Sequence, residues 1–95
     1  MRDPFEPTRE PARTLYKAFQ TEALKRRTRS VEEWVSSERL AVHSAAKAYA
    51  RTHGLREPTL EEVARAERYA MGSIDYGAKW AYQVEAAMQT GAQAQ

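Results

Sequence analysis

The chain has 95 residues, a net charge of +2 and no cysteine. This length predicts one small domain, and the lack of cysteine excludes disulfides and thiolate metal sites. No apolar run approaches the ~18 residues of a membrane span, so we expect a cytoplasmic protein. Alanine is abundant and β-branched residues are scarce, which favours helix nearly everywhere in the chain.

The first residues of the chain are rich in proline, which disfavours helix at the residue before it. We therefore expect an extended arm, followed by a helix that begins near Arg9 with Thr8 as its cap. The predicted organisation is a flexible N-terminal arm over 1–8, a single helical domain over 9–90 and a frayed tail over 91–95.

Two capping boxes mark the starts of further helices. Ser30 precedes Glu33 by three residues, and Thr59 precedes Glu62 by the same distance. In this motif the hydroxyl and the carboxylate each accept a hydrogen bond from the other residue's backbone amide. The first of the two helices is predicted to end at Gly54, since glycine is common just past a helix C-terminus.

The last helix-compatible stretch runs from Thr59 to Met88 and has apolar residues on two opposite sides. Gly72 and Ser73 lie inside it and favour a kink or a break. We expect either one bent helix or two helices that meet near Gly72. The predicted fold is all-α, a small antiparallel bundle of three helices, or of four if the chain breaks.

The expected core stripe of this stretch includes Met71 and Ile74. The opposite side carries Tyr69, Tyr76 and Trp80, at seven- and four-residue spacings, with Val84 at its edge. Tyrosine and tryptophan are enriched at binding hot spots, so these side chains and Leu40 form a candidate protein-binding surface. The alternative is that the same aromatic side chains pack against the other helices. If they form a surface, Trp80→Ala should leave the fold intact.

A second candidate surface is basic and suggests an alternative function, the binding of nucleic acid. Four cations fall within five residues at the end of the first predicted helix, and clustered cations can bind phosphates. A helix C-terminus also favours cations through its dipole alone, without any ligand. The candidate phosphate-binding residues are Lys25, Arg26, Arg27, Arg29, Arg51 and Arg56.

The residues from Gly54 to Ala64 resemble the opening of a helix-turn-helix segment in bacterial sigma factors, with a Gly-Leu-Arg-Glu-Pro-Thr run before paired glutamates. The resemblance implies contact with DNA through a downstream recognition helix. That helix would span 73–88, where Lys79 is the one cation. Reading base edges requires arginine, lysine, asparagine or glutamine, so the resemblance stays confined to the opening.

Three glutamates, Glu38, Glu67 and Glu85, fall within apolar stripes. Buried carboxylates need partners, and helical bundles can use them as metal ligands. However, neither His43 nor His53 follows an acid at the spacing of a di-iron site. We interpret the glutamates as structural groups that reach water, a tyrosine hydroxyl or an arginine, and we predict no catalytic residue, metal or cofactor.

The sequence therefore predicts a non-catalytic helical module that acts by binding another protein, a second copy of itself included. Small helical proteins of this kind are common among accessory and phage-type inhibitory factors. Nucleic-acid binding through the basic residues is the alternative.

Overall fold

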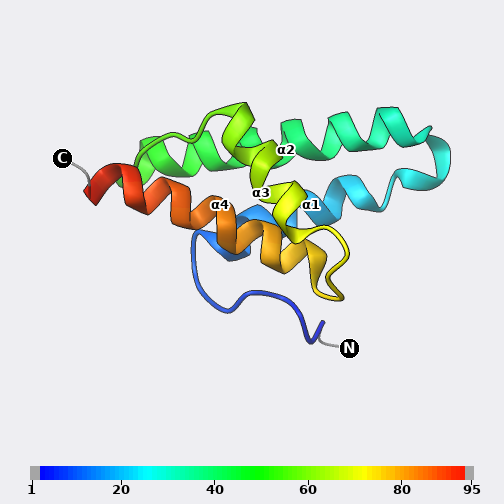
Figure 1. Ribbon diagram of the computed structural model, residues 1–95, viewed down its shortest axis with the longest axis horizontal. Coiled ribbons are helices and arrows are strands. Elements are labelled where there is room, and N and C mark those ends of the chain that lie inside the picture. The colour runs from blue at the N-terminus through cyan, green and yellow to red at the C-terminus, as the bar shows by residue number, and fades with distance from the viewer. Residues whose placement is uncertain (1–2, 94–95) are drawn as a thin grey trace.

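The computed structural model describes residues 3–93, with side chains to residue 89, and shows four α-helices packed against one another (Figure 1). No strand occurs within this part of the chain, which confirms the all-α bundle. The helices and a short 3₁₀ turn, η1, are α1 (Ala12–Ala23), η1 (Arg26–Thr28), α2 (Val31–His53), α3 (Leu60–Ala70) and α4 (Tyr76–Gln93).

Both predicted capping boxes are present. The Ser30 hydroxyl accepts from the Glu33 amide at 3.2 Å, and the Glu33 carboxylate accepts from the Ser30 amide at 2.8 Å. The same reciprocal pair forms at the start of α3 between Thr59 and Glu62. Gly54 closes α2 with a φ of 68°, a left-handed conformation that glycine adopts without a Cβ penalty.

The first helix is shorter than predicted at both ends. It begins at Ala12 rather than near Arg9, because Glu10 precedes Pro11 and is kept out of the helical region. The N-cap residue is Pro11 rather than Thr8, and the Glu10 carboxylate accepts a hydrogen bond from the Thr14 amide at 3.0 Å. It ends at Ala23, and the basic residues beyond it form η1. This turn directs the Arg26 side chain back towards α2, where it binds Glu38.

The C-terminal stretch breaks into two helices, α3 and α4, with five residues between them. Gly72 has a φ of 85°, and the Ser73 amide donates to the Ala70 carbonyl at 3.1 Å across the turn. Because of the break, the side of α4 that faces the core does not continue the helical repeat of α3. As a result Trp80 and Val84, expected opposite the core stripe, are buried, whereas Met71 and Ile74 from that stripe are exposed.

The core lies between all four helices and is built largely from alanine around a few large side chains. Trp80 is the largest fully buried residue, and Leu15 and Met88 are also buried. The Phe19 side chain of α1 packs directly on the α4 backbone at Gly77, where a Cβ would lie 2.5 Å from the Phe19 ring. Four small residues that would also suit a homodimer seam are buried within this monomer core: Ala66, Ala70, Gly77 and Ala81.

The segment before α1 lies along the bundle. The Asp3 carboxylate accepts hydrogen bonds from Tyr16 and Gln20 of α1, and Pro7 is buried. Residues 1–2 of the expected arm and 94–95 of the expected tail lie outside the described residues, while α4 continues to Gln93.

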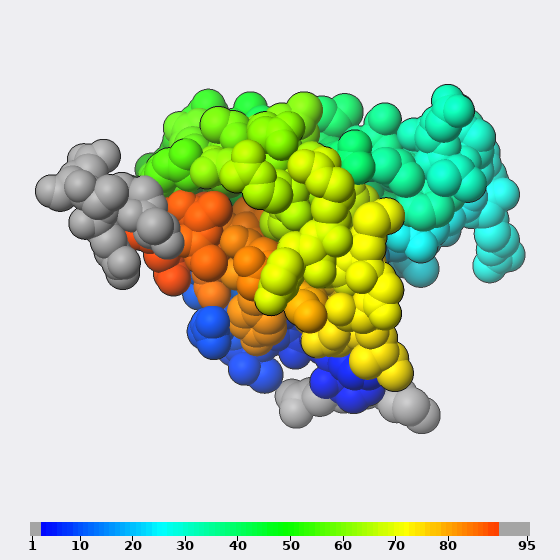
Figure 2. All heavy atoms as spheres, viewed as in Figure 1, coloured from blue at the N-terminus to red at the C-terminus, as the bar shows by residue number. Residues whose placement is uncertain are grey.

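The bundle is elongated, with extents of 42 × 29 × 24 Å. α1 and α2 form an antiparallel hairpin whose connecting end extends beyond α3 and α4, and Figure 2 shows this end as the cyan projection. Within the described chain no helix is both long and apolar enough to cross a membrane.

Candidate protein-binding surfaces

The predicted aromatic surface does not form, because its three members lie in different environments. Tyr69 at the end of α3 is 61% exposed, whereas Trp80 on α4 is 1% exposed. The indole Nε1 of Trp80 donates to the Val63 carbonyl at 3.0 Å. Tyr76 is half-buried, and its hydroxyl donates to Glu67 at 2.8 Å. The structure therefore supports the alternative, core packing, for Tyr76 and Trp80.

The six cations of the predicted phosphate-binding surface are also separated. Residues 25–29 precede α2, whereas Arg51 and Arg56 lie near its other end, and a helix of 23 residues is about 34 Å long. Within the described chain, all of them except Arg27 lie within 4 Å of a carboxylate. The pairs are Lys25 and Arg29 with Glu22, Arg26 with Glu38, Arg51 with Glu57, and Arg56 with Glu62.

These ion pairs reduce the charge available to a phosphate, and nucleic-acid binding stays a prediction. The helix that would read DNA in the sigma-factor resemblance corresponds to α4, which packs against α1 and α3. Its one cation, Lys79, lies 5.0 Å from the centre of the Tyr69 ring.

The three stripe glutamates are buried, and each binds an arginine from another segment. Glu38 accepts two hydrogen bonds from Arg26, at 2.6 and 2.7 Å. The other two form comparable pairs: Glu67 with Arg39 of α2 and Tyr76 of α4, and Glu85 with Arg9 and the Ala12 amide. Arginine and tyrosine partners are those that the sequence predicts for a structural role. No cluster of three or more potential metal ligands occurs among the described residues.

Two hydrogen-bonded tyrosine hydroxyls, on Tyr16 and Tyr76, give the fold an alkaline limit. Burial and a hydrogen bond to Asp3 raise the pKa of Tyr16 to about 12, and burial and Glu67 raise the pKa of Tyr76. Tyrosine in an unfolded chain has a pKa near 10, so the folded state holds these protons more tightly. For Tyr16 the resulting stabilisation is complete below about pH 10 and is lost as the pH rises through about 12.

We therefore expect the urea midpoint of the wild type to fall between about pH 10 and pH 12, and that of Tyr16→Phe to fall less. Far-UV circular dichroism of both proteins at several pH values provides the comparison. The two proteins share every other ionisable group, and each midpoint is referred to its own value at pH 8. Equal falls in the two proteins would contradict the prediction.

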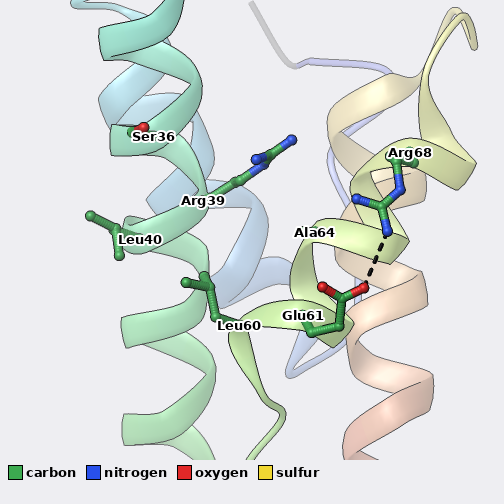
Figure 3. Close-up of a pocket in the computed structure, with 7 residues that line it drawn as sticks. All are labelled: Ser36, Arg39, Leu40, Leu60, Glu61, Ala64 and Arg68. Carbon is green, nitrogen blue, oxygen red and sulfur yellow. Dashed lines mark hydrogen bonds and ion pairs between the residues drawn. The ribbon is translucent and has the colours of Figure 1, made fainter.

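A groove of about 410 Å³ separates α2 from α3 (Figure 3). Leu40, the fourth residue of the predicted protein-binding surface, lies at its edge, is 57% exposed and points away from the other helices. Leu60, which is 43% exposed, lies across from it. The groove is lined by Ser36, Arg39, Leu40, Leu60, Glu61, Ala64 and Arg68.

Both arginines of the groove already bind a carboxylate. Arg39 donates through Nε to the buried Glu67, and Arg68 donates to Glu61 at 3.3 Å. The free part of the groove is consequently its leucine edge rather than an anion-binding site.

The end of α3 and the turn that follows it expose three large apolar side chains within six residues. Tyr69, Met71 and Ile74 are 61%, 62% and 88% exposed, and Figure 2 shows this turn, in yellow, at the periphery of the molecule. We call these three residues the apolar turn. Sequence periodicity missed Met71 and Ile74 because it placed them on a core stripe of an unbroken helix. Gly72 was the signal in the sequence that could have indicated a helix break and so excluded Met71 and Ile74 from the core stripe.

Comparison with protein-family models, with curated proteins and with solved structures gives no match to this chain. The function is therefore inferred from the surfaces described above.

Proposed function

We propose that this chain is a non-catalytic helical module that binds another protein through the apolar turn. The observation that carries the proposal is the exposure of Tyr69, Met71 and Ile74 on one short segment. Clustered exposed apolar side chains are typical of interaction sites, whereas isolated ones are common on any surface.

The chemistry of the turn suits insertion into an apolar pocket of a partner. Met71 can adapt its shape to irregular surfaces, and Tyr69 combines a large ring with a hydroxyl that can remain hydrated. The helices α3 and α4, which are both packed in the bundle, hold the two ends of the turn. Binding therefore costs little backbone entropy. Buried titratable groups support a non-catalytic role, since Glu38, Glu67 and Glu85 are all engaged in structural pairs.

The test uses Met71→Ser/Ile74→Ser, which removes two apolar side chains of the turn without touching the core. We expect each substitution to cost the complex about 2 kcal/mol, or roughly thirtyfold in Kd. Wild type and variant are tagged and used to capture partners from the source cells, and the Kd for a captured protein is then measured by calorimetry.

Leu24→Ser is the matched control, since Leu24 is 84% exposed but lies outside the turn, at the end of α1. A partner retained by wild type and by this control, and lost by the double variant, supports the proposal. Undiminished capture by the double variant, or no capture by any version, contradicts it. The accessory or inhibitory role and the cytoplasmic location stay predictions from the sequence.

A further inference from the structure

We propose that the exposed face of α2 is a self-association surface, on which a second copy of this chain packs antiparallel with Leu40 on the two-fold axis. This surface is separate from the apolar turn. The two proposals can therefore fail independently.

The face is defined by the helical repeat of α2. The buried residues Glu38, Val42, Ala46 and Ala50 form its inner side. With 3.6 residues per turn, the stripe on the opposite side passes through positions 33, 36, 40, 44 and 47. Leu40 at its centre is 57% exposed and points away from the other helices, so no helix of the monomer covers it (Figure 3).

The stripe is self-complementary in charge. Glu33 lies seven residues before Leu40, and Lys47 lies seven residues after it. In an antiparallel pair with its axis at Leu40, residue 40 + n of one copy faces residue 40 − n of the other. Glu33 of each copy then faces Lys47 of the other, twice by symmetry, as an isologous interface requires. A parallel pair would instead place like charges together.

Both charged groups have capacity for this contact. Glu33 uses its Oε1 to cap the Ser30 amide, which leaves Oε2 for another donor. Lys47 has no carboxylate within 4 Å among the described residues, although it is half-buried on α2. Exposed ion pairs contribute little affinity but specify orientation, which is the role assigned to them in this interface.

The remaining positions permit close packing. Ser36 and Ser44 lie four residues on either side of Leu40, so they face each other across the axis, and both are exposed. Small side chains let two helices approach to the usual 8–10 Å between axes. Leu60, beside Leu40 across the groove, adds a second apolar group from each copy. The contact is small relative to stable dimers, so association is expected to depend on concentration.

The first experiment is sedimentation equilibrium of the full chain from micromolar to millimolar concentration. We expect the mass to rise from 10.8 kDa towards twice that value, and Leu40→Glu to remain at 10.8 kDa. A wild type that stays monomeric at millimolar concentration overturns the proposal. Dimerisation that persists in Leu40→Glu overturns it as well.

The second experiment exchanges the charges. Glu33→Lys alone and Lys47→Glu alone should each dimerise at least tenfold more weakly than wild type, because each places like charges opposite one another. An equimolar mixture of the two should form a heterodimer, since both cross-contacts are then between opposite charges. No association in the mixture overturns the antiparallel arrangement.

Two further variants separate this effect from changes in folding. Glu33→Gln keeps an oxygen to cap Ser30 and loses only the charge, so it should dimerise several-fold more weakly with an unchanged circular dichroism spectrum. Lys17→Glu, on the exposed side of α1, should dimerise like wild type. Met71→Ser/Ile74→Ser should also dimerise normally, whereas Leu40→Glu should still capture a partner through the apolar turn.

Discussion

Replacing Trp80 with alanine is expected to lower the free energy of unfolding by about 3–5 kcal/mol, the usual cost of truncating a buried aromatic. Trp80 is 1% exposed, and its ring packs edge-on against Phe19 at a centroid distance of 5.7 Å. Alanine would leave a cavity beside Phe19 and Tyr76 and would remove the donor to the Val63 carbonyl. This loss is a large part of the roughly 5–15 kcal/mol that stabilises a typical domain.

Urea unfolding followed by far-UV circular dichroism measures the effect without depending on tryptophan fluorescence. Trp34→Ala is the matched control, because Trp34 is half-buried at the surface beneath the Arg26 guanidinium, 3.9 Å from the ring centre. We expect the control to lose less than Trp80→Ala. If alanine prevents folding altogether, Trp80→Phe keeps most of the packed area and should cost about 1–3 kcal/mol. Unchanged stability in Trp80→Ala would contradict the burial of Trp80 and would favour the exposed aromatic surface that the sequence suggested.

Replacing Arg26 with methionine is expected to cost about 3 kcal/mol, because it leaves the carboxylate of Glu38 buried without a partner. Glu38 is fully buried, and Arg26 binds both of its oxygens. The arginine side chain itself is 37% exposed, so water can reach part of the vacated space. This places the expected cost at the lower end of the range for broken buried pairs. Methionine keeps an apolar contact with Trp34, which isolates the loss of charge.

Removing both members of the pair should be much less harmful than removing one. In Arg26→Met/Glu38→Leu neither charge of this pair remains, and we expect stability within about 1 kcal/mol of wild type. Arg51→Met is the control, since Arg51 and Glu57 form an exposed pair worth about 0–1 kcal/mol. Chemical denaturation of the four proteins gives the comparison. A single variant no less stable than Arg51→Met, or a double variant less stable than the single one, would contradict this account.

Residue types alone predict those features of the fold that depend on neighbouring residues in the chain. The capping boxes at Ser30 and Thr59 and the glycine at the end of α2 act within one turn of backbone, so their residue types predicted the helix ends. The helical spacing of Ala12, Leu15 and Tyr16 likewise indicates the buried side of α1, because helical periodicity is also local.

Which surfaces are free, in contrast, depends on how the helices pack together. The break at Gly72 rotates α4 relative to α3, and this rotation buries Trp80 while it exposes Ile74. Similarly, Arg26 belongs to a basic run in the sequence but binds Glu38 twelve residues away, because η1 turns it back onto α2. The rotation of one helix relative to the next, and the ion pairs between helices, depend on how the helices pack together. Local residue patterns do not encode this packing.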